Sequence, residues 1–118
     1  MGARAMMGMG AAMDKRLHTA LIELRCRFET LYGERLVRMV LFGSQARGDA
    51  EPGSDIDVLV VLKGPVEPYE EIKRSSDIVG ELSLDWDVVI SCVFMDENQF
   101  FQRDGPFLRN VRREGVAV

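Results

Sequence analysis

The sequence predicts a small domain of the α/β or α+β class, in which a short β-sheet packs against helices. The chain has 118 residues, which is enough for one compact core. Hydrophobic patterns with helical and strand periods follow one another in the order α, β, β, α, β, α, without an internal repeat. No apolar run approaches the roughly 18 residues that a membrane span requires. We therefore expect one soluble, cytoplasmic domain without membrane contact.

The first expected helix spans residues 14–33. Apolar residues recur there at steps of three and four and form one stripe, with arginines and glutamates elsewhere. Asp14 is expected to cap this helix and Gly33 to end it. The stripe consists of Leu17, Leu21, Leu24, Phe28 and Leu31. Residues 1–13 hold several methionines among alanines and glycines, and we interpret them as a flexible leader before a single domain over 14–118.

Two strands come next. Leu36–Phe42 is short, apolar and rich in β-forming residues, and a Gly-Ser pair ends it, as is typical of a buried strand. The polar stretch 45–54 is expected to form a loop or short helix followed by a turn. Ile56–Leu62 is expected to be the second strand. Its period of two places Asp55 and Asp57 on one face, side by side.

The second half of the chain begins with an expected amphipathic helix over residues 69–82. A third strand is predicted over 83–94, where the spacing of two directs Asp85 and Asp87 to one face. The apolar residues at helical spacing in the preceding helix are Ile72, Val79 and Leu82.

The C-terminal part carries helix signals and an excess of arginine. Asp96 and Gln99 have the spacing of a capping box, Pro106 suits the first turn of a last helix, and Gly115 suits its end. The net charge of −4 argues against a dedicated nucleic-acid surface, because phosphate neutralisation drives such binding. We interpret the arginines as a charged helix end that balances an acidic body; the alternative is a patch that faces RNA or a nucleotide. The arginines are Arg103, Arg109, Arg112 and Arg113.

The two cysteines, Cys26 and Cys92, stand far apart within apolar patterns. We expect both to be reduced, buried thiols of a cytosolic protein. Two cysteines and the lone His18 do not suffice for a zinc site.

The residues around the first two strands suit phosphate chemistry. Two aspartates at a spacing of two on a rigid strand can jointly hold Mg²⁺, a hard cation that offsets the charge of a transferring phosphoryl group. Gly43 lets the backbone approach a phosphate closely, and the hydroxyl of Ser44 can donate to its oxygens. A phosphate loop of the Gly-Lys-Ser/Thr kind is absent from the sequence.

These elements also form a family signature. Gly-Ser, Ala-Arg-Gly and Ser-Asp-x-Asp, followed by an apolar strand, occur in order within residues 41–48 and 54–60. In this respect the chain resembles the DNA-polymerase-β-like nucleotidyltransferases, in particular their minimal, antitoxin-type members. The resemblance implies a minimal nucleotidyltransferase fold, with three carboxylates on one face of a short mixed sheet and helices packed on the other. It also implies transfer of a nucleoside monophosphate, from ATP by preference, to a hydroxyl group.

The same resemblance implies residue roles. Gly43 and Ser44 would hold the β and γ phosphates of the nucleotide, with Arg47 beside them. Two Mg²⁺ or Mn²⁺ ions would lie between Asp55, Asp57 and a third carboxylate. Periodicity leaves that third carboxylate open between Asp85 and Asp87. The resemblance favours Asp87, which directly precedes an apolar run, as the third aspartate of the family does.

The resemblance also implies a partner. Larger family members append a helical domain that binds the acceptor, whereas this sequence ends at Val118, soon after its last expected helices. A helical protein of the HEPN type would then supply the acceptor, and the chain would be an antitoxin that adenylylates its toxin. The alternative is an inactive nucleotidyltransferase-like module that neutralises a partner by contact alone. The base preference and the oligomeric state stay open, a homo-oligomer included.

Overall fold

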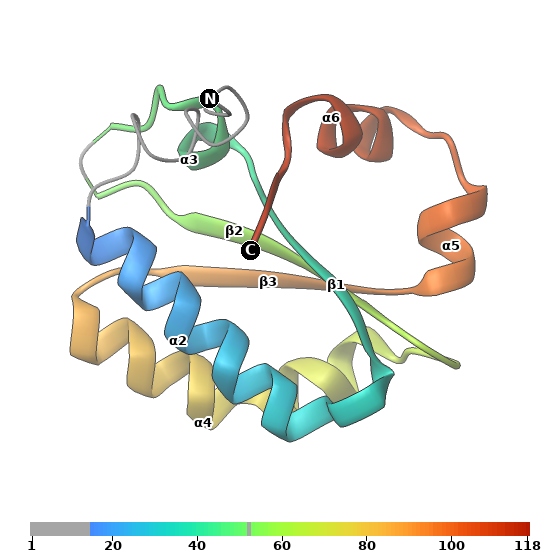
Figure 1. Ribbon diagram of the computed structural model, residues 1–118, viewed down its shortest axis with the longest axis horizontal. Coiled ribbons are helices and arrows are strands. Elements are labelled where there is room, and N and C mark those ends of the chain that lie inside the picture. Colours follow the sequence, from blue (N-terminus) through green and yellow to red (C-terminus); the bar gives the residue numbers. More distant parts are fainter. Residues whose placement is uncertain (1–14, 52) are drawn as a thin grey trace.

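A four-stranded mixed sheet forms the centre of the molecule, whose computed structural model describes residues 15–51 and 53–118. The strand order is β3-β2-β1-β4, and helices lie on both faces (Figure 1). β1 runs antiparallel to β2 and β4, whereas β2 and β3 are parallel. The strands are β1 (Leu36–Phe42), β2 (Ile56–Leu62), β3 (Ile90–Asp96) and β4 (Val116–Ala117). The predicted class with a mixed sheet is confirmed, and β4 is an addition to the predicted strands.

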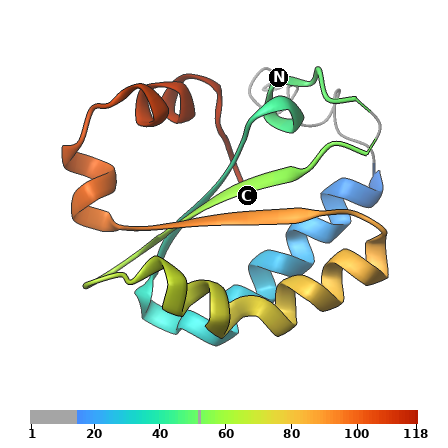
Figure 2. The ribbon, with the colours of Figure 1, turned by 180° about the vertical axis from the view of Figure 1, so that it is seen from behind.

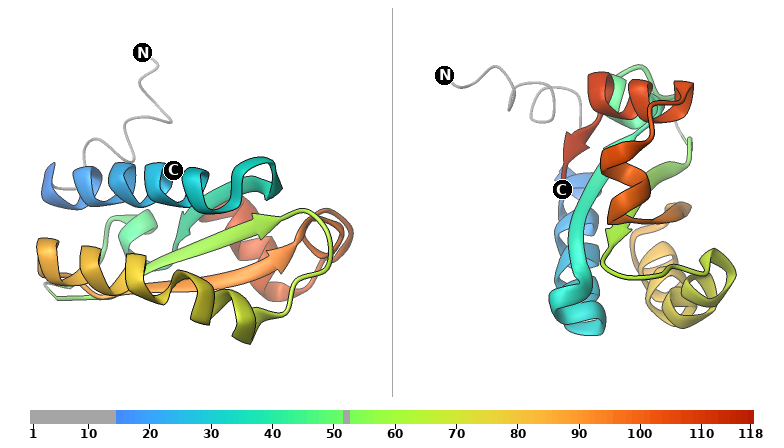
Figure 3. Two further views of the ribbon diagram at one scale, coloured as in Figure 1. Left: turned by 90° about the horizontal axis from the view of Figure 1, so that it is seen from below. Right: turned by 90° about the vertical axis from the view of Figure 1, so that its right-hand side faces the viewer.

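Two long helices cover one face of the sheet. α2 and α4 run side by side along this face (Figures 2 and 3). β3 is an edge strand of the sheet. The shorter helical elements lie in the segments before and between the strands. The helical elements are α2 (Lys15–Tyr32), the 3-10 turn η1 (Gly33–Arg35), α3 (Ser44–Arg47), α4 (Pro68–Trp86), α5 (Glu97–Gln102) and α6 (Pro106–Glu114). The expected leader over 1–13 and the cap at Asp14 lie outside the described residues.

The sheet buries apolar side chains on both faces, which follows from the alternation along β2. One set of alternate residues packs against α2 and α4, and the other set packs against α5 and α6. The first set is Ile56, Val58, Val60 and Leu62. The second set, Leu59 and Val61, meets Phe100, Leu108 and Val111. Helices therefore cover the face opposite the acidic pair, as expected, and α5 and α6 also cover part of the face that carries it.

The prediction of a strand over residues 83–94 is wrong in its first half. α4 continues to Trp86, because Leu82 and Trp86 stand one helical turn apart and both contact the core. The Trp86 indole N–H also donates to Glu23 of α2 over 3.2 Å. Asp85 is therefore an exposed helical residue, and Asp87 is the left-handed C-cap of α4 with φ 53°. Neither residue lies on the face of a strand.

Two smaller expectations also need correction. Ile72 is half exposed, and the buried side of α4 contains Glu71 and Ser75 instead. The Glu71 carboxylate tolerates burial because it pairs with Arg74 over 3.0 Å and with Arg35 over 3.7 Å. The buried Ser75 hydroxyl donates to the Glu71 backbone carbonyl over 2.8 Å. Cys26 is exposed rather than buried.

Other local signals are confirmed. The capping box at Asp96 and Gln99 is present in both directions, Pro106 opens α6, and Gly115 follows its end. Within residues 15–51 and 53–118, the helices are too short or too polar to cross a membrane.

Candidate functional site

The Gly-Ser turn after β1 and the acidic pair at the start of β2 meet at one end of the sheet. Antiparallel pairing sets Phe42 opposite Asp57, so Gly43 lies beside the carboxylate. A Cβ atom built at Gly43 would lie 2.6 Å from Asp57 Oδ2, closer than such atoms approach. Gly43 also has φ 77° and ψ −159°, a backbone conformation essentially restricted to glycine. Both the space and the backbone therefore require glycine at this position.

The two aspartates differ in exposure. Asp55 precedes β2 and is exposed, whereas Asp57 lies within the strand and is half buried. Burial raises the pKa of the Asp57 carboxyl, and the nearby negative charge of Asp55 raises this pKa further. A divalent cation bound between two such carboxylates would relieve their repulsion, and carboxylate oxygens are the ligands that Mg²⁺ prefers. The acidic pair therefore fits a metal ion by its chemistry.

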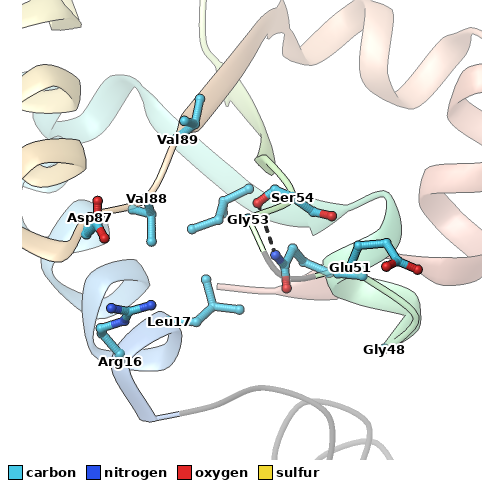
Figure 4. A pocket seen from close by; sticks show the side chains of 12 residues that line it. Arg16, Leu17, Gly48, Glu51, Gly53, Ser54, Asp87, Val88 and Val89 are labelled. Carbon is cyan, nitrogen blue, oxygen red and sulfur yellow. Dashed lines mark hydrogen bonds between the residues drawn. The ribbon is translucent and has the colours of Figure 1, made fainter.

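The structure does not bring the third predicted carboxylate to this pair. Asp87 lines a cavity of about 640 Å³ on the α2 side of the sheet, together with Leu17 and Ile56. Figure 4 shows Asp87 and Arg16 at one end of this cavity and Ser54 at the other. Asp55 and Asp57 are not among its lining residues. Among the residues that the structure describes, no group of three acidic, histidine or cysteine side chains is placed to hold a metal ion.

The cavity nevertheless borders the loop that carries the sequence motif. Gln45 of α3 donates its side-chain amide to the Ser54 carbonyl over 3.3 Å, which is the dashed line in Figure 4. This bond ties the segment after Gly43 to the residue before Asp55. The hydrogen bond from Gln45 to Ser54 therefore joins the two halves of the motif at a second point, in addition to the Gly43–Asp57 contact.

Arg47 lies at the end of α3 and is exposed. Its guanidinium forms ion pairs with Asp49 over 3.2 Å and with Glu114 over 3.5 Å. Glu114 is the last residue of α6, and α6 is held to β1 by an edge-to-face contact between Phe107 and Phe42, with ring centroids 5.2 Å apart. Arg47 therefore joins α3 to α6 beside the motif. The sequence pattern gave no signal for Glu114, because the pairing spans 67 residues and arises only from the fold.

A second residue that the sequence analysis did not identify is Ser91. It pairs with Asp57 in the register of the parallel strands β2 and β3. Val89, which lies just before β3, and Val93, two residues after Ser91 in the strand, are 54% and 39% exposed. Sequence reasoning missed this pairing for two reasons. The predicted third strand starts too early, and the register between strands cannot be read from one sequence.

Comparison with known proteins agrees with this arrangement. The family model described as "Nucleotidyltransferase domain" matches residues 21–116. A Methanocaldococcus jannaschii protein named "Putative protein adenylyltransferase MJ0141" is 36% identical over 96 residues, 81% of this chain and 92% of that protein. Another from the same organism, of the same description and numbered MJ0604, is 36% identical over 100 residues, 84% of this chain and 94% of that protein.

Solved structures show the same fold. A crystal structure of a toxin–antitoxin with AMP-PNP superposes with a TM-score of 0.57 at 18% identity, over 84% of this chain and 69% of that chain. A mutant of the toxin–antitoxin MntA-HpeT superposes with a TM-score of 0.55 at 15% identity, over 79% of this chain and 68% of that chain. Together with the family match, the fold and the motif geometry make this chain a nucleotidyltransferase that belongs to the nucleotidyltransferase domain family.

Proposed function

We propose that this protein transfers AMP from ATP to a hydroxyl group on a partner protein, in a reaction that depends on Mg²⁺. The contact between Gly43 and the Asp57 carboxylate is the observation that carries the proposal, because it joins the phosphate-binding turn to the acidic pair. The names of the relatives, which describe adenylyltransferases of proteins, support the choice of nucleotide and of acceptor class.

The turn after β1 would bind the triphosphate. Gly43 leaves room for phosphate oxygens where any side chain would fill the space beside Asp57. Ser44 follows Gly43 directly and is half buried. Its hydroxyl can donate a hydrogen bond to an oxygen of the β or γ phosphate. Arg47, exposed at the end of the same short helix, adds positive charge next to the phosphates.

Asp55 and Asp57 would hold the metal. Mg²⁺, or Mn²⁺ in its place, would supply positive charge that offsets the triphosphate. The α phosphorus would then accept the hydroxyl oxygen, which loses its proton, while the bond to the β phosphate breaks and pyrophosphate leaves. Two such ions are proposed, in line with the family resemblance. The role that the resemblance gives Asp87 stays a prediction: if it holds, Asp87→Asn should lower transfer while Asp85→Asn should not, and wild-type transfer by Asp87→Asn would reject it.

The acceptor is proposed to lie on a separate helical protein of the HEPN type, with this chain as its antitoxin. The similarity in fold to chains of toxin–antitoxin structures supports this assignment. The alternative, neutralisation by contact alone, would leave no reason for the glycine conformation and the acidic pair to coincide at one point.

The test is a transfer assay on the chain co-expressed with the protein encoded beside it. ATP labelled at the α phosphate should label the partner, whereas ATP labelled at the γ phosphate should not. Asp57→Asn should abolish the label without preventing formation of the complex. Transfer of the γ label, or an unchanged rate in Asp57→Asn, would reject the proposal.

A further inference from the structure

The neighbouring strand presents a hydroxyl, and not a carboxylate, beside the acidic pair. β2 and β3 are parallel, and Asp57 and Ser91 are partners in their register. Paired residues of parallel strands direct their side chains to the same face, on strands about 4.8 Å apart. The register is fixed at its start by the bond from the Ile56 N–H to the Val89 carbonyl, 2.8 Å long. Ser91 is therefore the residue of β3 that lies next to the Asp57 side chain.

The other strand positions around Asp57 offer no oxygen ligand from a side chain. Phe42 pairs with Asp57 on the β1 side, and Gly43 follows it. Val89, two residues before Ser91, is apolar. Asp87 belongs to the end of α4, and the cavity that it lines lies on the α2 side of the sheet. A third ligand from the sheet beside Asp57 can therefore come only from Ser91.

We propose that Ser91 occupies the third-ligand position of this site, so that the chain supplies two carboxylates and one hydroxyl. This inference rests on the proposed function. A hydroxyl is a weaker ligand for a hard cation than a carboxylate. Two carboxylates balance the charge of one divalent cation. A second cation would therefore bind only when the triphosphate supplies further negative charge. The free protein therefore binds metal weakly, and ATP and metal bind cooperatively.

The surroundings of Ser91 allow a direct test by substitution. Ser91 is half buried, and Val89, just before β3, and Val93, two residues after Ser91, are considerably exposed. An aspartate at position 91 therefore fits without displacing core residues. Ser91→Asp restores the third carboxylate, and Ser91→Asn is the matched control, with the same size and no charge.

The experiment measures Mn²⁺ binding to the nucleotide-free protein by electron paramagnetic resonance, together with melting temperature in EDTA and in Mn²⁺. Ser91→Asp should bind Mn²⁺ at least about tenfold more tightly than wild type, which corresponds to about 1.4 kcal/mol. Its melting temperature should be below wild type in EDTA and should rise more than that of wild type when Mn²⁺ is added. Ser91→Asn should show neither change, and Asp87→Asn should bind Mn²⁺ as wild type does.

Two results separate this inference from the proposed function. Unchanged Mn²⁺ affinity in Ser91→Asp, with loss of affinity in Asp87→Asn, would overturn the inference and identify Asp87 as the third ligand. In that case Asp57→Asn would still weaken Mn²⁺ binding, and the proposed function would stand. If Asp57→Asn binds Mn²⁺ and Mg²⁺-ATP like wild type, the proposed function itself fails.

Discussion

Gly43 lies so close to Asp57 that a Cβ atom at position 43 would stand 2.6 Å from the Asp57 Oδ2 atom. The strand pairing of β1 with β2 produces this contact, since Phe42 and Asp57 are register partners. It makes one site of two motifs that are separated along the sequence.

Gly43→Ala should destabilise the protein and weaken ATP binding. Alanine is strained at φ 77° and would also push the Asp57 carboxylate away, so the free energy of unfolding should fall by about 2 kcal/mol or more. Gly64→Ala is the matched control, because Gly64 has φ 79° and open space around it. The control should lose only about 1 kcal/mol and bind ATP normally. Urea unfolding and ATP titration measure both effects, and equal losses in the two variants would contradict the contact.

Asp57→Asn should melt at or slightly above wild type in EDTA at pH 7. The pKa of Asp57 is raised in the folded protein, so the ionised carboxylate favours the unfolded chain above the ordinary pKa of aspartate. This penalty appears as pH rises through that range, and asparagine removes it. Because Asp57 is only half buried, the gain in melting temperature should be a few degrees at most. Calorimetric melting that places the variant well below wild type would argue against repulsion between the two carboxylates.

Arg47→Ala should lower ATP affinity with little effect on stability. The guanidinium is exposed, and its ion pairs with Asp49 and Glu114 contribute little in water. Glu114→Ala removes the longer of these ion pairs and keeps the positive charge, so it should retain most of the affinity. If the two variants lose affinity equally, Arg47 acts by holding α6 in place and not by contacting phosphate.

The two thiols should react at very different rates. Cys26 is exposed, while burial raises the pKa of the Cys92 thiol to about 12. At pH 8 the Cys92 thiolate fraction is lower than that of an ordinary cysteine by a factor of at least about 100. Alkylation should therefore modify one thiol in the native protein and two after unfolding, and mass spectrometry counts the modified thiols. The Cys26→Ser variant should resist alkylation until it is unfolded, and rapid labelling of that variant would contradict the shielding of the partly buried Cys92 thiol by the core.

The sequence predicts the elements around the site well, because each has a strong local signal. Alternation along Ile56–Leu62 fixes both faces of β2, and the Gly-Ser pair ends β1 at the point where Gly43 is needed. The contact of Gly43 with Asp57 itself requires the strand pairing, which the motif order indicates only through the family resemblance.

The errors lie where local and tertiary signals compete. Asp85 and Asp87 alternate with apolar residues as a strand would, yet Leu82 and Trp86 meet the core at helical spacing and prolong α4. Asp87, in the left-handed conformation, then ends that helix, and hydrophobic periodicity does not indicate this end. Strand β4 has two residues, too few for any pattern. The position of Ser91 beside Asp57 depends on the register of β3, which becomes visible only once that strand is placed correctly.

Calorimetric titration of the purified chain with ATP tests the central claim most directly, because the claim is that Gly43, Asp55 and Asp57 form one site for metal and triphosphate. In Mg²⁺ the wild-type protein should bind ATP, and in EDTA its affinity should fall at least about tenfold, since the carboxylates then repel the phosphates. Asp57→Asn should lose the dependence on Mg²⁺. Equal ATP affinity of the wild-type protein in Mg²⁺ and in EDTA would contradict the claim.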